Sequence, residues 1–266
     1  MSKLTVNETT CFYEQSGRGP HLLLLHGFTG SLKNWEHLLH QLSSHYTVTR
    51  IDILGHGRSD SPANPQRYQM AAIAQDLIEI CAQLKIEQFH LLGYSMGGRL
   101  AFFTAVTYPK HILSLTLESS SPGLATLAER DARKKRDNAL ADRIEEEGIE
   151  SFVNFWESLS LWESQKQLSE ESRFKLREQR LKNNPQGLAN SLRGMGTGVQ
   201  PSLWPKLPTL QIPTRLIVGE LDQKFVKINQ QMAAQLPNAT LHIIPQAGHT
   251  VHLEKPDDYL ATGFKL

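Results

Sequence analysis

Apolar runs and amphipathic segments alternate along most of the chain. Apolar runs typical of buried strands are found at 21–25, 47–51, 89–92, 112–117, 240–244 and from Thr214 onward. Apolar residues at helical spacing predict helices over 35–42, 69–84, 97–108 and 226–236. Because strands and helices of these lengths alternate, we expect an α/β fold with a doubly wound, mostly parallel sheet.

Two segments depart from this alternation. Residues 3–15 alternate loosely between polar and apolar and end in a glycine-rich turn, which predicts an antiparallel hairpin at the start of the sheet. Residues 123–204 contain no predicted strand and are charged and helical in pattern. We therefore expect a core made of 1–122 and 205–266, with 123–204 inserted between two core strands as a helical lid that encloses a substrate.

Composition narrows the classes of function. The chain has 266 residues, with 28 basic and 27 acidic side chains, and this balance argues against binding to nucleic acid or to an anionic membrane. It has no apolar run of membrane-spanning length and no apolar stretch typical of a signal peptide near the N-terminus. Cys11 and Cys81 lie in unrelated patterns and are expected to be packing residues. These features predict a soluble cytoplasmic protein.

The stretch Gly93-Tyr94-Ser95-Met96-Gly97 lies between a predicted strand and a predicted helix. It matches G-x-S-x-G, the nucleophile elbow in which a sharp turn lifts a serine hydroxyl above a sheet. The strained turn leaves no room for side chains at the flanking glycines. Ser95 is therefore the candidate nucleophile, against the alternative of a chance glycine-serine turn.

A second glycine-bearing loop, His26-Gly27-Phe28-Thr29-Gly30, follows the strand at 21–25. In serine hydrolases such a loop gives one backbone N–H to the oxyanion hole, and the residue after the nucleophile gives the other. We assign these donors to Phe28 and Met96. The alternative for His26 is a strand-end turn held by a hydrogen-bonded histidine, and His56 is better explained as a histidine that organises its own turn.

Asp222 and His249 each come just after a predicted strand, and the chain order Ser95, Asp222, His249 is that of an α/β-hydrolase triad. Taken singly, Asp222 fits a helix N-cap and His249 fits a loop histidine. His252 competes for the role of base, but the glycine before His249 favours His249. A metal pair formed by the two histidines lacks a third ligand in the sequence.

Arginines give the clue to the substrate. Arg99 lies four residues after Ser95, one helical turn away, and an arginine there suits a carboxylate better than an apolar ester. The inserted segment adds stripes that include Arg133 and Arg180. Pairing on a solvated face, as between Glu129 and Arg133, is the alternative for each of these arginines. The pattern predicts a small substrate with several carboxylates.

Several motifs together resemble one family, the 2-succinyl-6-hydroxy-2,4-cyclohexadiene-1-carboxylate synthases of menaquinone biosynthesis. The motifs are HGFTG at 26–30, GYSMGGR at 93–99, SPGL at 121–124, SLRGMGTG at 191–198, QPSLW at 200–204 and GELDQKF at 219–225. This resemblance covers essentially the whole chain. The glycines from Gly194 to Gly198 resemble a phosphate-binding loop only superficially, since a preceding strand and a lysine are missing. We interpret them as a turn of the lid.

The resemblance implies an elimination of pyruvate, with the α/β-hydrolase fold and with no metal and no organic cofactor. It implies that Arg99, Arg133 and Arg180 bind substrate carboxylates, that Tyr94 is a site tyrosine, and that Trp156 is a wall of the lid. The residues alone leave two alternatives open. One is a serine esterase or C–C bond hydrolase with the same triad, and the other is a non-catalytic ligand receptor on a hydrolase fold. Oligomeric state is not encoded in any of these patterns.

Overall fold

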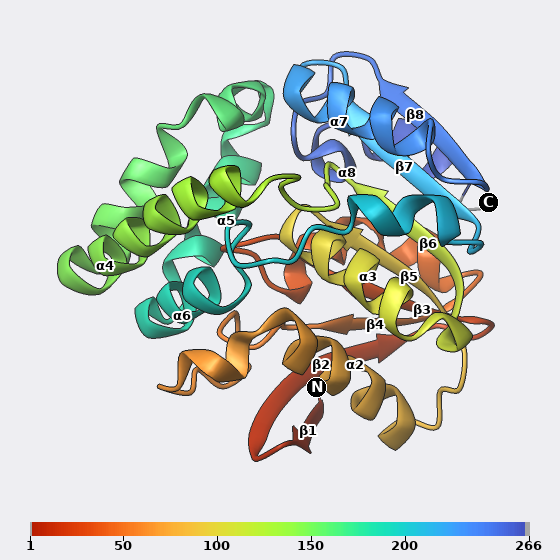
Figure 1. Cartoon of the computed structure of the whole chain (residues 1–266), viewed down its shortest axis with the longest axis horizontal. Helices are drawn as coiled ribbons and strands as arrows, with labels where there is room; N and C mark the ends of the chain where they lie inside the picture. The colour runs from red at the N-terminus through yellow and green to blue at the C-terminus, as the bar shows by residue number, and fades with distance from the viewer. Residues whose placement is uncertain (1, 264–266) are drawn as a thin grey trace.

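Eight strands form one sheet in the order β1-β2-β4-β3-β5-β6-β7-β8, in a computed structural model that describes residues 2–263 (Figure 1). The strands are β1 Ser2–Val6, β2 Thr9–Ser16, β3 His21–Leu25, β4 Thr47–Ile51, β5 Phe89–Tyr94, β6 Ile112–Glu118, β7 Thr214–Gly219 and β8 Ala239–Ile244. Strands β1, β2 and β4 pair antiparallel, and all pairs from β4 to β8 are parallel. The predicted fold class, including the N-terminal hairpin, is confirmed.

Helices cover both faces of the sheet. The helices of the core are η1 Leu32–Leu38, α1 Leu39–Ser43, η2 Pro65–Tyr68, α2 Met70–Gln83, α3 Met96–Thr107, η3 Pro109–His111, η5 Trp204–Thr209, α7 Gln223–Ala233, α8 Val251–Glu254 and α9 Pro256–Ala261. The helix predicted over 35–42 begins as a 3-10 helix at Leu32, because Ser31 and Asn34 form a capping box there. The helix predicted from 226 begins at Gln223, because the Asp222 side chain caps it.

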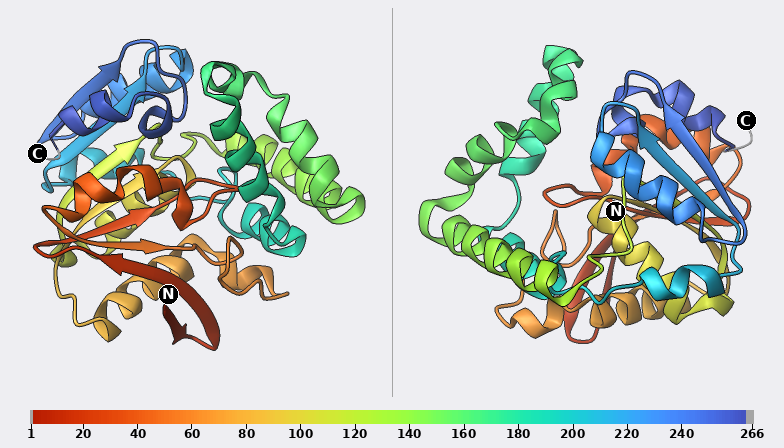
Figure 2. Two further views of the ribbon diagram at one scale, coloured as in Figure 1. Left: turned by 180° about the vertical axis from the view of Figure 1, so that it is seen from behind. Right: turned by 45° about the horizontal axis from the view of Figure 1, so that its top comes forward.

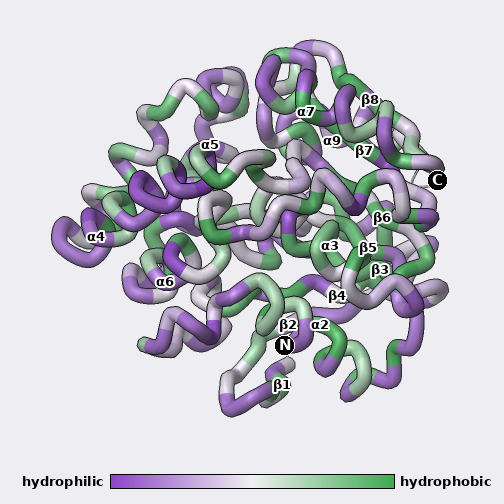
Figure 3. The backbone as a smooth tube through the Cα atoms, viewed as in Figure 1, coloured by the Kyte–Doolittle hydropathy of each residue, from purple (hydrophilic) through white to green (hydrophobic). Residues whose placement is uncertain are grey.

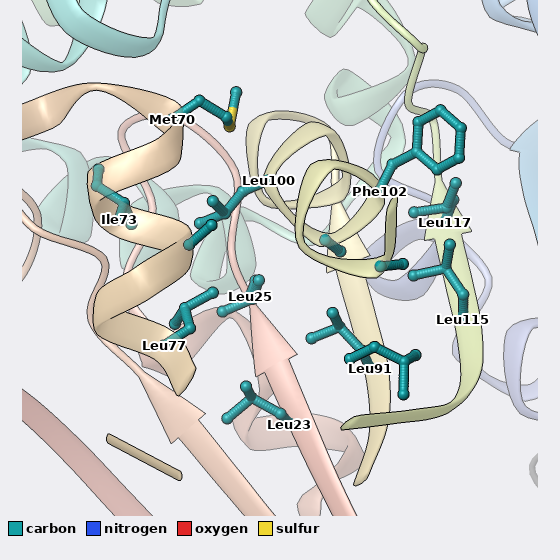
Figure 4. Packing of buried hydrophobic residues seen from close by; sticks show 14 of the residues in the cluster. Leu23, Leu25, Met70, Ile73, Leu77, Leu91, Leu100, Phe102, Leu115 and Leu117 are labelled. Carbon is teal, nitrogen blue, oxygen red and sulfur yellow. The ribbon is translucent and has the colours of Figure 1, made fainter. Parts of the chain in front are cut away.

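Two apolar clusters hold the sheet between its helices. On one face the inward side chains of β3, β5 and β6 meet α2 and α3, and Figure 4 shows Leu77, Leu100 and Phe102 against Leu91 and Leu115. On the other face Trp35 and Leu38 from η1 pack with Leu92 and with Tyr259 from α9. The strands that end at the site are therefore buried on both faces, as their apolar sequences predict.

The segment between β6 and β7 contains four helical elements and, among the described residues, no strand: α4 Leu127–Glu157, η4 Ser160–Gln167, α5 Glu170–Leu181 and α6 Pro185–Met195. Gly148 interrupts α4 with a φ of 80°. These helices lie beside the sheet at its carboxyl edge and are more hydrophilic along their length than the core strands (Figures 2 and 3). They have an apolar cluster of their own, built around Ile144, Phe152 and Leu188.

The chain reverses direction across the sheet between β3 and β5. From β3 the chain moves outward to β4, and it then returns to the far side of β3 to form β5. Loops that follow such neighbouring strands diverge, and the crevice between them is where open α/β sheets bind ligands. The loop at 26–30 follows β3 and the turn at Ser95 follows β5, so the topology alone places both at this crevice. No helix among residues 2–263 is both long and apolar enough to span a membrane.

Leu92→Ala tests whether the strand that carries Ser95 is held by the core. Leu92 is fully buried on β5, so its truncation should lower the free energy of unfolding by about 2–5 kcal/mol. Leu113 on β6 is 40% exposed, and Leu113→Ala should cost no more than about 0.5 kcal/mol. Urea denaturation of both variants checks this expectation. Equal losses would show that the second apolar cluster does not support β5.

Candidate active site

Ser95 occupies the turn between β5 and α3 in a strained conformation, with a φ of 51°. Its backbone N–H donates to the Glu118 carbonyl at 2.8 Å, which ties the turn to the end of β6. A Cβ on Gly93 would overlap the Gly97 carbonyl oxygen, and a Cβ on Gly97 would overlap the His26 carbonyl oxygen. The turn thus has the geometry expected of a nucleophile elbow.

The three predicted triad residues lie together. His249 Nε2 is 3.0 Å from Ser95 Oγ, and His249 Nδ1 is 2.6 Å from Asp222 Oδ2. The other carboxylate oxygen, Oδ1, accepts a hydrogen bond from the Phe225 N–H at 3.4 Å. Asp222 therefore caps α7 and holds the histidine at the same time, so it makes both the contact expected of a helix N-cap and the contact expected of a triad acid.

The two competing histidines have separate partners. The His252 ring is fully buried and its Nδ1 lies 2.8 Å from both carboxylate oxygens of Glu118, of which Oε1 also accepts the His252 backbone N–H at 3.1 Å. This ring packs against the Trp35 ring in a tilted arrangement, with the ring centroids 4.4 Å apart. Its hydrogen bond and its packing are thus directed to the core, whereas His249 bonds Ser95, so geometry favours His249 as the base.

The loop at 26–30 lies against the serine. A Cβ on Gly27 would come within 3.6 Å of Ser95 Cβ and would overlap the Tyr94 ring. Met96 is the first residue of α3, so its N–H has no acceptor within the helix and carries the partial positive charge of a helix N-terminus. Both segments that carry the predicted oxyanion donors thus adjoin Ser95, and the donor roles of the Phe28 and Met96 N–H groups stay a prediction.

His26 and His56 hold this loop in place through hydrogen bonds and ring packing. His26 Nδ1 donates to the Gly27 carbonyl at 2.8 Å, and His26 Nε2 accepts the Ile53 N–H at 3.0 Å. The His56 ring packs on His26 at 5.2 Å and edge-on to Phe28 at 5.7 Å. Burial lowers the pKa of His26 to about 4 and that of His56 to about 3. Both rings are therefore neutral supports of the turn.

A small pocket lies beside the triad, lined by the chain neighbours of Ser95 and His249. Its polar lining comes from Tyr94, Thr250, Gln165 and Arg180, and its apolar lining includes Trp162. Trp156 is not among the lining residues; it packs behind them, edge-on to Phe28 at 5.4 Å and against Trp162 at 5.6 Å. Trp156 therefore lies behind the pocket lining, and its role as a wall residue of the lid stays a prediction.

The predicted arginines fall into two groups. Arg99 Nη1 donates to the Met195 carbonyl and to Gln200 Oε1, both at 2.8 Å, and Arg99 has no carboxylate partner among the described residues. Burial, with the nearby charge of Arg133, lowers its pKa to about 10, so it remains a cation at neutral pH. Arg180 lies instead on the pocket side, where it pairs with Glu157 at 2.9 Å.

Arg133 pairs with Asp137 at 2.6 Å, one turn further along α4. The alternative pair of Arg133 with Glu129 does not form, because the Glu129 carboxylate accepts from the Thr126 N–H and hydroxyl in a capping box. Asp137 also accepts the Gly198 N–H at 3.3 Å, and a Cβ on Gly198 would overlap α4. Gly194 lies in the last turn of α6, and Gly196 and Gly198 form the turn that packs on α4 and leads to Gln200.

A family model described as the alpha/beta hydrolase fold matches residues 20–256. A putative 2-succinyl-6-hydroxy-2,4-cyclohexadiene-1-carboxylate synthase of Bacillus subtilis (strain 168) is 48% identical over 92% of this chain and 90% of its own. The chain belongs to this synthase family, within the α/β-hydrolase fold. The synthase of Enterobacter sp. (strain 638) is 32% identical over 89% of this chain and 87% of its own.

Solved structures agree with this membership. The structure of MenH from S. aureus superposes with a TM-score of 0.90 at 36% identity and covers 96% of this chain and 97% of that one. A hydrolase from Pseudomonas aeruginosa PA01 gives a TM-score of 0.85 at 25% identity, with 98% and 95% covered. The resemblance drawn from the motifs is therefore confirmed.

The sequence motifs did not predict several polar residues that lie at or near the site. Gln165 and Thr250 line the pocket, Gln200 holds Arg99, and Glu118 holds His252. Sequence position could have pointed to two of them: Thr250 directly follows His249, and Gln200 begins the QPSLW motif. Gln165 lies in a stretch of ordinary helical composition, and its role depends on tertiary contacts alone.

Stability should fall as the solution is acidified. Both His26 and His56 titrate near 6.5 in an unfolded chain and near 3–4 when folded, so between these values the unfolded state binds protons that the folded state does not. The free energy of unfolding should drop between pH 6.5 and about 4, by about 1.4 kcal/mol per pH unit for each histidine.

Urea denaturation at pH 7, 6 and 5 measures this slope. His56→Gln removes one of the two groups and should make the slope shallower, whereas His40→Gln, at an exposed position, should leave it unchanged. A slope in His56→Gln as steep as in the unmodified chain would contradict the assignment of a buried neutral ring.

Proposed function

We propose that this chain eliminates pyruvate from 2-succinyl-5-enolpyruvyl-6-hydroxy-3-cyclohexene-1-carboxylate to give 2-succinyl-6-hydroxy-2,4-cyclohexadiene-1-carboxylate, a lyase step of menaquinone biosynthesis. The observation that carries the proposal is the arginine that follows the nucleophile turn. Arg99 is a largely buried cation with only neutral oxygens as partners, one helical turn after Ser95. Such a guanidinium favours an anionic ligand, and family membership supplies the ligand's identity.

The names of substrate and product fix which bonds change. The ring C2–H bond breaks, and its electrons form the C2=C3 double bond. The C3=C4 double bond moves to C4=C5, and the C5–O bond to the enolpyruvyl group breaks. The enolpyruvate that leaves becomes pyruvate when its methylene carbon takes up a proton. No water is consumed, so the reaction requires a base and an enolate-stabilising site rather than an acyl-enzyme.

The triad geometry supports base catalysis. His249, 3.0 Å from Ser95 Oγ, takes the hydroxyl proton as Ser95 accepts the proton from ring C2, and Asp222 holds the ring in the required tautomer. The negative charge develops on the succinyl carbonyl oxygen, which the Phe28 and Met96 N–H groups bind. Each such donor is worth roughly 3–4 kcal/mol of transition-state stabilisation in comparable sites.

The substrate carries three carboxylates, and this supports roles for Arg99, Arg133 and Arg180 in binding it. Arg133 and Arg180 are paired with Asp137 and Glu157, so a substrate carboxylate has to share or replace those partners. Residues 123–204 act as a lid that contributes two of these arginines and limits access of water. We also propose a cytoplasmic location, since Cys11 and Cys81 are free thiols of the kind found in reducing compartments.

Ser95→Ala tests the role of the triad. The purified protein should release pyruvate from the enolpyruvyl substrate, and Ser95→Ala should lower kcat by about 100-fold or more because the acid–base group is lost. A lactate dehydrogenase-coupled assay measures pyruvate directly. Rapid hydrolysis of aryl esters without any release of pyruvate would contradict the proposal and favour the esterase alternative. Full activity of Ser95→Ala would instead favour a reaction that does not use the triad.

Arg99→Met tests the role of the buried cation. The variant should raise KM for the substrate by roughly 10- to 100-fold, the usual weight of a charge-assisted hydrogen bond. Arg143→Met is the matched control, since it removes the same charge from an exposed pair with Glu147 on α4. Steady-state kinetics of pyruvate release separate the two. An Arg99→Met enzyme with unchanged kcat/KM would exclude a binding role for this residue.

A further inference from the structure

A line of four hydrogen-bonded side chains joins the helical segment to the residue before Ser95. Arg180 Nη2 donates to Gln165 Oε1 at 3.1 Å, and Gln165 Nε2 donates to Thr250 Oγ1 at 2.9 Å. The Thr250 hydroxyl in turn lies 2.9 Å from the Tyr94 hydroxyl. All four side chains line the pocket, and each is less than a tenth exposed.

The chemistry of its members gives this line a direction. A guanidinium only donates, so the glutamine oxygen faces Arg180 and the amide nitrogen faces Thr250. Thr250 Oγ1 therefore accepts from Gln165 and has a single proton left to give. If Tyr94 donated to Thr250, the Thr250 proton would be the one left over. When Thr250 donates to Tyr94, the donors all run in one direction from Arg180, and the Tyr94 proton is left over instead.

Within residues 2–263, Thr250 is the only hydrogen-bond partner of the Tyr94 hydroxyl. When Thr250 donates, the surplus Tyr94 proton is therefore available to the pocket that Tyr94 lines. We propose that Gln165 and Thr250 are positioning residues that fix the Tyr94 hydroxyl as a hydrogen-bond donor to a substrate oxygen beside Ser95. This inference rests on the proposed function, because it assigns a task to the tyrosine of that same site.

Two further features agree with a donor role. Burial raises the pKa of Tyr94 well above 10, so the phenol keeps its proton at neutral pH. Arg180 begins the line with a full positive charge, and charge at one end of a hydrogen-bond chain strengthens the donors along it. Since Arg180 and Gln165 belong to the helical segment, this segment helps to set the hydrogen bonding of a residue on β5.

Gln165→Glu reverses the line with almost no change in shape. A carboxylate accepts from Arg180 and also from Thr250, so Thr250 then accepts from Tyr94 and the tyrosine proton is withdrawn from the pocket. Gln179→Glu is the matched control, because Gln179 lines the same pocket but donates to Asn34. Both variants add one negative charge near a polyanionic substrate, and only the first touches the line.

The experiment measures the cost of Tyr94→Phe, as the fall in kcat/KM for pyruvate release, in three backgrounds. The cost should be roughly tenfold or more in the unmodified chain and in Gln179→Glu, the usual weight of a hydrogen bond to a charged group. In Gln165→Glu it should fall to less than about twofold, because the hydroxyl no longer serves the substrate. Thermal unfolding of each variant confirms that the fold is retained.

An equal cost of Tyr94→Phe in all three backgrounds would overturn the inference, as would the absence of any cost in the unmodified chain. Neither result would touch the proposed function, which stands on pyruvate release by the unmodified chain and its loss in Ser95→Ala. Absence of pyruvate release by the unmodified chain would overturn both.

Thr250 provides an independent arm. Thr250→Ser keeps the hydroxyl and should retain most of kcat, whereas Thr250→Val keeps the shape and should lower kcat about as much as Tyr94→Phe does. Val and Ser variants with equal kcat would show that the hydroxyl has no part in positioning Tyr94.

Discussion

Three backbone segments approach one another at Ser95 more closely than side chains allow, and the site depends on that approach. Strand β5 turns directly into α3 at a φ of 51°, and the loop after β3 presses against the start of the helix where Gly97 lies. A non-glycine residue in the left-handed region is strained, and the strain persists only where the surroundings over-determine it. Here β5 is clamped by two apolar clusters and the Ser95 N–H is bonded to β6. The core of the sheet thus holds the serine in the one conformation that brings its hydroxyl to His249.

The polar residues around this turn serve two purposes at once. Asp222 gives one carboxylate oxygen to α7 and the other to His249, so the acid is oriented by the helix that it caps. His26 closes the loop at Gly27 with one ring nitrogen and holds Ile53 with the other. A buried polar atom costs free energy unless it is bonded, so each of these residues has a fixed orientation before any substrate arrives. This preorganisation is what catalysis by hydrogen-bond donors requires.

The sequence predicted the sheet, the elbow and the triad because each depends on local pattern and chain order. Residue type and position were enough to predict the strand at 89–92, the serine turn, and the acid and histidine that follow later strands. The hydrogen-bond and ion-pair partners of individual side chains were harder to predict. Arg133 pairs with Asp137 rather than Glu129 because Thr126 captures the Glu129 carboxylate, a competition between two local motifs. The roles of Gln165 and Glu118 were not predicted, because their partners, Thr250 and His252, lie 85 and 134 residues away in the chain. A single sequence carries no information on such distant pairs.

The arginines of the site differ in what compensates their charge, and this difference has a consequence for binding. Arg180 is balanced by Glu157, so a carboxylate gains from it only by displacing or sharing that partner. Arg99 bonds two neutral oxygens, so its charge is left for a ligand to neutralise. In a buried ion pair, the attraction between the two charges offsets the free-energy cost of removing them from water only when both charges are present. For Arg99, folding has already removed much of the guanidinium from water. A substrate carboxylate that reaches Arg99 therefore gains more there than at Arg180. In the proposed reaction we therefore expect the strongest contact with the polyanionic substrate on α3, the helix that begins at the nucleophile turn, where it would hold the reacting carbon near Ser95.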